Sequence, residues 1–481
     1  MAFYHGIKTQ EVATSVISPI QTTAELPVVI GTAPVHLASE PKVNEPVICY
    51  SYAEAVQYLG YSDKWDQYTL CEAIYSQFQL YAVKPVVFIN VLDPETHKTA
   101  VASASHAVTD KAVTLTDDVL LDSLVVKGEE EGSAAVVNTD YTAAHDADGN
   151  TVITILDDGS LKSASNVYIA YDKIDASKVD ADDIIGGVDD SDKSTGLELI
   201  NLIYSMFSLV PGLLLAPGWS ENPEVAAVMK AKSRSINGLF KCTTLVDIDT
   251  TQVKSYSGCN MWKSGNNYTG EAQYVCWPMV RNGSKIFHMS THVMGIIGQT
   301  DAANDDTPFQ SPSNQSMQIT GMCLKDGTEV MLYLDQANLL NSQGIATALN
   351  FTGGWKLWGN YTGAYPGTTD VKDTFLCVRR MFDWNDTTFI LTYWNKIDMP
   401  IVPKNVKIIL DSENIRLNGL TAQGKILGGK VEFLEEENPT TDLLAGIIRF
   451  HTKWTPPVPA QEISNTSEYD VTNFQNLFSE S

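Results

Sequence analysis

The sequence predicts a multidomain α/β or α+β protein, in which an inserted all-β module interrupts an α/β core and extended arms lie at both ends. Three observations support this prediction. The chain has 481 residues, and at ~150 residues per domain this length favours about three domains. Hydrophobic residues make up 44% and charged residues 19%, which supports buried cores and argues against disorder. Strand and helix patterns alternate along the chain, except over one stretch of strict period two.

The first part of the chain combines an arm with the beginning of the α/β core. Residues 1–22 contain scattered β-branched residues and too few apolar positions for a folded unit, so we expect an arm there. Short apolar strands and helical patterns follow, and their alternation is typical of an α/β layer. The expected elements are strands within 24–34, at 45–50 and at 84–94, and helices at 51–60 and 66–82.

The middle of the first half differs, because alternation of apolar and polar residues dominates from about 96 to 179. Acidic or glycine-containing turns separate these segments, which predicts an inserted all-β module. One turn, DADGN at 146–150, partly resembles a calcium loop. It lacks the remaining ligand positions and the closing glutamate, so a hairpin turn is favoured.

A second α/β stretch and a C-terminal domain follow an acidic linker. Helical patterns lie at 194–209, after Asn222-Pro223, at 373–396 and at 404–422, and strands are expected at 428–436 and 445–454. The predicted organisation is an arm (1–22), a first core part (23–95), the β module (96–179), a linker (180–193), a second core part (194–350), a C-terminal domain (351–460) and an arm (461–481).

Charge and composition exclude several function classes. The net charge is −26, which disfavours binding to nucleic acid or to an anionic membrane. Residues 101–190 alone contain 19 acidic groups and 5 lysines, so the β module is expected to face solvent. No signal peptide or membrane span is visible, and the seven cysteines form no CxxC motif. We therefore expect a soluble protein made in the cytoplasm, without a disulfide framework.

Motifs for catalysis or metal binding are incomplete. His288 and His292 have the spacing of a zincin helix, but HMSTH lacks its glutamate. Gly218-Trp219-Ser220 continues to asparagine where a nucleophile elbow needs glycine, so Ser220 is interpreted as a helix N-cap. No phosphate loop or dinucleotide fingerprint is present. We expect no catalytic residue, no metal site and no cofactor.

Both chain ends instead carry features of association. They are long and mildly alternating, and 22 extended residues reach at most ~75 Å. Such an arm can add a strand to a neighbour's sheet edge. Frayed termini are the alternative interpretation.

Several segments keep an order and spacing that are distinctive in combination. They are YHGIKTQEV at 4–12, PVVIGTAP at 27–34, SPSNQ at 311–315, WKLWGNYTG at 355–363, VRRMFDWNDTTF at 378–389, and the runs 398–429 and 438–461. Together they resemble the sheath proteins of contractile phage tails and R-type tailocins. One departure is the Asn360-Tyr361 pair, where relatives often carry a basic residue before the threonine.

The resemblance implies a structural subunit, not an enzyme, that polymerises as stacked hexameric rings around an inner tail tube and contracts to drive the tube through an envelope. Baseplate and tail terminator proteins are the further partners it implies, with assembly in the bacterial cytoplasm and a final place in a virion tail or released particle. It also implies strand exchange between subunits. The expected donors are Ile7, Thr9, Val12, Tyr469, Val471 and Phe474, the acceptor sheet contains Val431, Phe433, Ile447, Arg449 and His451, and the candidate tube-facing residues are Lys404, Lys407, Arg416, Lys425 and Lys430.

Two other functions remain as alternatives at this point. One is an α/β enzyme with an unrecognised site, and the other is a β-rich surface adhesin, for which no export signal is visible. The sequence also leaves open whether the particle is a phage, a tailocin or another injection device.

Overall fold

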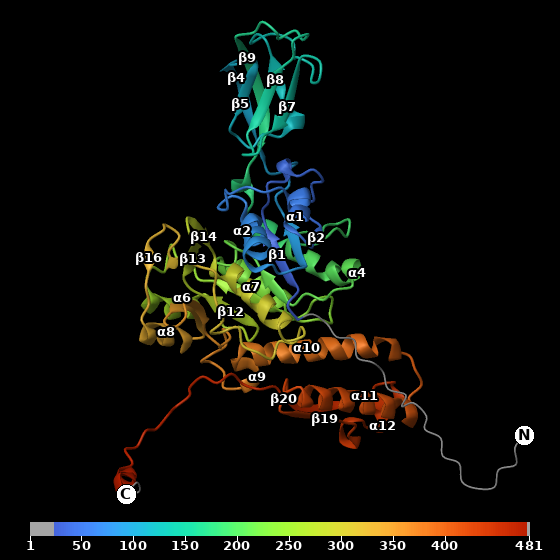
Figure 1. The fold of residues 1–481 in the computed structure, drawn as a ribbon. Coiled ribbons are helices and arrows are strands. Elements are labelled where there is room, and N and C mark those ends of the chain that lie inside the picture. Colours follow the sequence, from blue (N-terminus) through green and yellow to red (C-terminus); the bar gives the residue numbers. More distant parts are fainter. Residues whose placement is uncertain (1–23, 479–481) are drawn as a thin grey trace, which may run out of the picture.

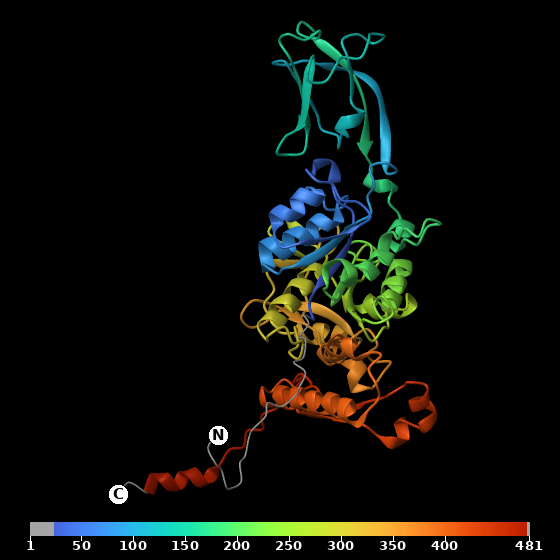
Figure 2. The ribbon, with the colours of Figure 1, turned by 90° about the vertical axis from the view of Figure 1, so that its right-hand side faces the viewer.

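The computed structural model describes residues 24–478, so predictions for 1–23 lie outside the described residues. Figure 1 shows a β region (98–174) at the top, an α/β core in the middle and a helical layer at the bottom. The C-terminal segment leaves this layer and projects away from the body. Figure 2, turned by 90°, shows the β region and the helical layer on opposite sides of the core.

The core is built on an eight-stranded mixed sheet. Its six central strands are parallel, and an antiparallel strand closes each edge. Most of these strands are buried along their length, as expected when both faces of a parallel sheet are covered. In spatial order the strands are β18 (Trp355–Trp358), β17 (Ile345–Asn350), β12 (Gln273–Cys276), β11 (Thr243–Asp247), β10 (Leu213–Leu215), β1 (Pro27–Gly31), β3 (Val86–Asn90) and β2 (Pro46–Cys49).

Helices connect the strands of the core, and local signals explain where several begin. Ser51 accepts a hydrogen bond from the N–H of Glu54 at the start of α1, and Asn222 caps α5 with Pro223 in its first turn. The predicted cap, Ser220, is wrong, because its hydroxyl accepts the N–H of Asp247 in β11. The bounds are η1 (Val35–Leu37), α1 (Tyr52–Leu59), α2 (Thr69–Tyr75), η2 (Ser76–Tyr81), α3 (Ala181–Ile185), η5 (Gly196–Leu202), α4 (Ile203–Phe207), α5 (Pro223–Lys232), η6 (Tyr256–Gly258), α6 (Cys259–Gly265), α7 (Met289–Ala302) and α8 (Leu334–Asn341).

The helix expected at 194–209 differs from the structure. The segment forms a 3-10 helix, η5, followed by the short α4, which ends where Ser208 adopts a left-handed conformation. Leu197, Leu199 and Ile200 are all buried. Leu199 lies on a different side of the helix from Leu197 and Ile200, so the segment is buried on more than one side and lacks the single apolar face of an amphipathic α-helix.

A four-stranded antiparallel sheet packs beside α6 and α8 in Figure 1. Its buried side chains, including Val280, Phe287 and Met322, join the main hydrophobic core. The strands in order are β14 (Lys285–Phe287), β13 (Met279–Asn282), β15 (Gly321–Cys323) and β16 (Glu329–Val330).

The β region has a separate hydrophobic core between two three-stranded antiparallel sheets. Asp146 accepts the N–H groups of Asp148 and Asn150 in the turn between β7 and β8, so this turn is a hairpin turn. One sheet contains β4 (Lys98–Ala107), β9 (Asn166–Ile174) and β6 (Val125–Lys127), and the other contains β5 (Ala112–Leu115), β8 (Thr151–Ile155) and β7 (Tyr141–His145). The short helix η3 (Leu121–Ser123) precedes β6 in the sequence, and η4 (Ala176–Lys178) follows β9.

A polar contact joins the β region to the core. Asp118 of the β region accepts hydrogen bonds from Lys64 at 2.8 Å and from Tyr68 at 2.9 Å. Beside it, the rings of His36 and His145 meet edge to face with centroids 5.5 Å apart. Burial lowers the pKa of His36 to about 4. Burial also lowers the pKa of His145, so desolvation favours the neutral form of both rings in this contact.

The helical layer contains two long antiparallel helices and a two-stranded sheet (Figure 1). Its small core consists of Met381, Trp384, Leu417, Leu420, Ile426 and Val431. The bounds are α9 (Val371–Thr374), α10 (Leu376–Tyr393), η7 (Trp394–Lys396), α11 (Pro403–Ala422), β19 (Gly428–Glu432), η8 (Glu435–Glu437), α12 (Thr440–Leu444), β20 (His451–Thr455) and η9 (Val471–Phe478). Among the described helices, none has the length and apolar composition that crossing a membrane requires.

Candidate assembly site

Buried ion pairs fix the helical layer to the core. Arg380 of α10 pairs with Asp301 at the end of α7, and both side chains are almost fully buried. Arg234, which follows α5, donates two hydrogen bonds to Asp383 at 2.8 and 3.1 Å. Arg379 also bonds to Asp383, at 2.9 Å. The VRRMFDWN segment therefore docks α10 on the α/β core.

The same cluster anchors the beginning of the described chain. Arg380 donates a hydrogen bond to the carbonyl of Ala24 at 3.2 Å. Burial, together with the nearby carboxylates of Asp301 and Asp306, raises the pKa of Glu25 to about 8. The backbone thus enters β1 next to α10.

The two-stranded sheet of the helical layer has one closed edge and one open edge. On the outer edge of β19, the backbone N–H of Val431 donates to the side chain of Asn414 at 3.0 Å, and the Asn414 amide donates to the Val431 carbonyl at 3.1 Å. Asn414 lies on α11, so its side chain takes the place of a neighbouring strand.

The register then identifies the open edge. Val431 is opposite Thr452, and its bonds to Asn414 show that it does not bond to β20. Because bonded and non-bonded pairs alternate in an antiparallel ladder, Thr452 and Trp454 direct their backbone groups away from β19. No further strand follows β20 among the described residues. The outer edge of β20 can accept another strand.

These contacts change the picture of the predicted acceptor residues. Val431 and His451 lie in β19 and β20, but Phe433, Ile447 and Arg449 lie between the strands. Asn438 bonds to both backbone groups of Arg449, at 2.7 and 3.0 Å, and the N–H of Ile447 is bonded as well. His451 faces Glu432 within the sheet. The open positions are therefore Thr452 and Trp454, which sequence analysis did not identify.

The predicted C-terminal donors lie on the projecting segment. Residues 456–470 have no regular structure, and Tyr469 is among them, whereas Val471 and Phe474 lie in the 3-10 helix η9. All three are exposed. The predicted donors Ile7, Thr9 and Val12 lie outside the described residues.

The candidate tube-facing residues divide into two groups. Lys404, Lys407 and Lys430 are exposed. The expectation for Arg416 and Lys425 is corrected, because both side chains are buried in contacts within the chain. Arg416 bonds to Glu413 at 2.7 Å, and Lys425 bonds to Asp305 and Thr307, each at 3.1 Å.

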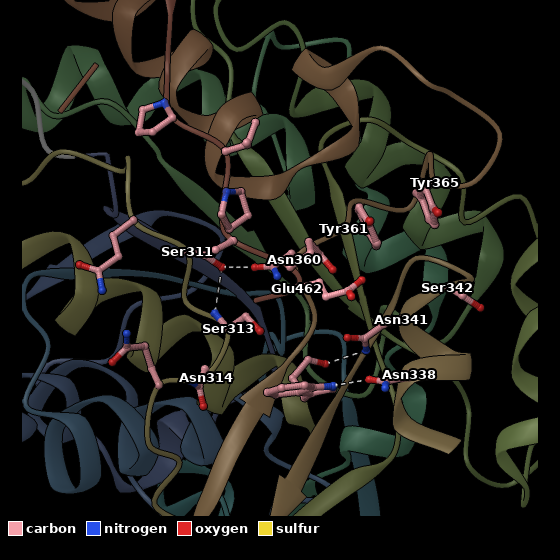
Figure 3. Close-up of a pocket in the computed structure, with 18 of the residues that line it drawn as sticks. Ser311, Ser313, Asn314, Asn338, Asn341, Ser342, Asn360, Tyr361, Tyr365 and Glu462 are labelled. Carbon is pink, nitrogen blue, oxygen red and sulfur yellow. Dashed lines mark hydrogen bonds between the residues drawn. The ribbon is translucent and has the colours of Figure 1, made fainter. Parts of the chain in front are cut away.

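Two of the distinctive sequence motifs meet in one polar pocket of about 750 Å³. In Figure 3, the Ser311 hydroxyl donates to the Asn360 side chain and accepts from the N–H of Ser313 at 3.1 Å. Asn341 bonds to the Trp358 carbonyl at 2.9 Å. SPSNQ and WKLWGNYTG thus brace each other, and Asn360, a departure from the family pattern, is part of that contact. The first residues of the projecting segment, including Glu462, line the same pocket.

The histidines considered for metal binding have structural contacts. His288 bonds to Glu72 at 2.8 Å, and the Glu72, Glu221 and Asp247 carboxylates raise its pKa to about 10 despite burial. His292 contacts the hydroxyl of Tyr81 at 2.8 Å, and burial lowers its pKa to about 3. Within the described residues, no group of three or more His, Cys, Asp or Glu side chains could hold a metal ion.

Comparison with solved structures identifies the fold. The contracted sheath complex of the PVC extracellular contractile injection system aligns with 98% of this chain and 99% of its own, at 13% identity and a TM-score of 0.58. A chain of the anti-feeding prophage baseplate aligns with 98% of this chain and 100% of its own, at 14% identity and a TM-score of 0.57. The chain has the fold seen in contractile sheath structures.

Curated relatives agree with this result. The tail sheath protein of Burkholderia phage BcepMu is 28% identical over 98% of both chains. A putative prophage major tail sheath protein of Pseudomonas aeruginosa is 25% identical over 61% of this chain and 74% of its own, and the Escherichia phage P2 tail sheath protein is 22% identical over 58% and 69%. No family model matches the chain. The resemblance to contractile tail sheath proteins is confirmed, and these homologues are structural proteins.

Proposed function

We propose that this chain is the structural subunit of a contractile tail sheath. It polymerises as stacked hexameric rings around an inner tail tube and contracts to drive that tube through a cell envelope. Baseplate and tail terminator proteins are the proposed partners at the two ends. Contraction is a rearrangement of subunit contacts and needs no catalytic group.

One observation carries this proposal, namely an open strand edge and a detached segment in the same chain. The β20 edge exposes the backbone groups of Thr452 and Trp454, while the segment after Glu462 extends away from the body (Figure 2). Unpaired strand edges are templates for pairing with another chain. Strand addition from a neighbouring copy therefore satisfies backbone groups that a single copy leaves unpaired.

The proposed donor is the stretch just before η9. Tyr469, a predicted donor, lies in it, and its acidic neighbours Glu468 and Asp470 suit the exposed Lys453 of β20 and the Lys430 side chain nearby. Opposite charges on paired strands stabilise by about 0.2–1 kcal/mol per pair. We propose that the N-terminal arm (1–22), including Ile7, Thr9 and Val12, donates in the same way from the other end.

The β region is proposed as an outward-facing domain inserted into the sheath core. It lies on the side of the core opposite to the helical layer (Figures 1 and 2), so a tube next to the helical layer would leave the β region at the outside. Lys404, Lys407 and Lys430 remain candidates for contact with the tube.

Electron microscopy of the purified full chain tests the proposal. Striated tubes or rings are expected, and removal of 462–481 is expected to abolish them while circular dichroism and the unfolding transition stay unchanged. Persistent monomers of the full chain, both alone and with its tube protein, would contradict the proposed function.

A further inference from the structure

The end of the chain carries an apolar row that its own body leaves uncovered. Side chains three positions apart lie above one another in a 3-10 helix, so Val471, Phe474 and Leu477 of η9 form one row about 12 Å long. These residues are 65%, 55% and 74% exposed. Figures 1 and 2 both show η9 separated from the rest of the chain. We call these three residues the C-terminal stripe.

A groove of matching character lies where α10 turns into α11. Its cavity measures about 80 Å³. Since cavities of about 150 Å³ hold benzene, this one has room for a single aliphatic side chain. Ile397 and Ile447, beside the cavity, are 65% and 44% exposed. The apolar lining consists of Met399, Pro400, Ile401, Val406, Ile409 and Ile448, among other residues. We call this the corner groove.

Charge makes the stripe and the groove complementary. The sequence after Lys453 contains no lysine or arginine, and Glu462, Glu468 and Asp470 precede the stripe. Lys396 lines the corner groove, and Lys404 and Lys407 lie on the first two turns of α11. The structure gives none of these three lysines an ion pair with a described residue. An acidic apolar segment suits this surface better than an uncharged one.

Strand direction places the stripe at the groove. A donated strand that pairs antiparallel with β20 runs from Thr455 towards His451 and ends near Ile448, which lines the groove. The strand-forming stretch before Val471 is then followed directly by η9. If the donated strand ran parallel to β20 instead, η9 would follow at the Thr455 end, away from the groove.

We propose that the C-terminal stripe of one copy docks on the corner groove of a neighbouring copy, with one of its aliphatic side chains filling the cavity, directly after an antiparallel donated strand. This inference rests on the proposed function and adds the direction of the donor and the place where it ends. The partner is a second copy of this chain.

Disulfide trapping between full-length chains tests the docking. All seven cysteines are buried, so introduced thiols are the accessible ones among the described residues. Leu477→Cys and Met399→Cys chains are mixed under assembly conditions with a mild oxidant. We expect a mixed dimer at a yield at least tenfold above that of a Leu477→Cys and Leu444→Cys mixture. Leu444 is a stringent control because it is apolar and more exposed than Met399, 83% against 40%, but lies on α12.

Each outcome has a defined meaning. Equal yields with Met399→Cys and Leu444→Cys overturn the docking. So does a Leu477→Cys, Met399→Cys chain that cross-links only within itself. If tubes form without the specific cross-link, the docking fails while the proposed function stands. If no tubes form, a fluorescent peptide of residues 462–478 is titrated into the full chain. Binding at least tenfold tighter than that of its Phe474→Ser, Leu477→Ser version is expected, and equal binding refutes the docking.

The role of Lys404 and Lys407 separates tail docking from tube contact. With the tube protein absent, Lys404→Glu with Lys407→Glu should lower the cross-link yield several-fold, and Glu468→Lys with Asp470→Lys should restore it. An effect seen only when tube protein is present would assign these lysines to the tube and remove the charge argument for the groove.

Discussion

The α/β core and the helical layer bury apolar surface to very different extents. The core surrounds an eight-stranded sheet with one continuous hydrophobic cluster, whereas six residues make up the buried cluster of the helical layer. From Trp394 onwards the chain instead exposes many large apolar residues, including Ile397, Leu427 and Leu444. The core is complete in a single copy. The helical layer is held to the core by buried ion pairs and leaves much of its apolar surface exposed in a single copy.

The largest expected effect concerns the link between the two regions. Arg380→Met removes the partner of the buried Asp301 and leaves that carboxylate uncompensated next to Glu25. We expect a loss of about 3–5 kcal/mol in the free energy of unfolding, measured by urea denaturation. Lys430→Met is the control, since Lys430 is exposed and its pair with Glu432 is worth less than about 1 kcal/mol. Equal effects of the two changes would mean that the buried pair does not hold the layer.

A matched pair of cavities compares the regions directly. Leu417 of α11 and Leu214 of β10 are both fully buried, and each change to alanine is expected to cost about 2–5 kcal/mol. The two variants should differ in which parts of the chain lose hydrogen-exchange protection. Leu214→Ala should lower hydrogen-exchange protection throughout the chain, while Leu417→Ala should lower it mainly in α10, α11 and β20. Uniform loss of protection in both variants would show that core and layer unfold as one unit.

The contact between the core and the β region should respond to acid. His36 has a folded-state pKa of about 4 against ~6.5 in the unfolded chain, so the unfolded state binds more protons between these values. The free energy of unfolding should therefore fall as pH decreases from 6.5 to 4, by on the order of 2 kcal/mol from this residue. His145, Asp118, Lys64 and Tyr68 face it. Denaturant unfolding of His36→Phe should show a shallower pH slope, and an unchanged slope would contradict the assignment.

The variant expected to change stability least, Thr452→Pro, should impair assembly most. Thr452→Pro removes a backbone N–H that points away from β19, so the free energy of unfolding should change by less than about 1 kcal/mol. Tube formation, followed by electron microscopy, should be lost because the open edge can no longer accept a strand. Lys453→Pro, one position along, breaks a bond inside the sheet and should destabilise the chain itself. Normal tubes from Thr452→Pro would show that β20 is not the acceptor.

Sequence periodicity predicted many of the elements because their apolar patterns are local. The helix expected at 404–422 corresponds to α11, and the strand at 84–94 contains β3. Local pattern failed at 194–209, where several apolar residues are buried on more than one face, and at 445–450, where the Asn438 side chain holds the backbone outside a strand. Such side-chain to backbone bonds leave no periodic signal.

The candidate assembly site could not be predicted in the same way, because it depends on contacts between residues that are distant in sequence. Arg380 and Asp301 are 79 positions apart, and nothing in either neighbourhood indicates the pairing. Asn414 looks like an ordinary helix residue, yet it decides which edge of the sheet is open. The burial of Arg416 did have a signal, because Glu413 lies three positions before it on the same helix face.

The side-chain amide of Asn414 also decides how many edges of the β19–β20 sheet can bind a further strand. A ribbon that is open on both sides can extend without limit, as fibrils do, but one side of this ribbon is sealed by its own chain. Further strands can thus be added to this sheet on the β20 side alone. Assembly through one edge of the sheet, without unlimited extension at both edges, can depend on the side-chain amide of one residue.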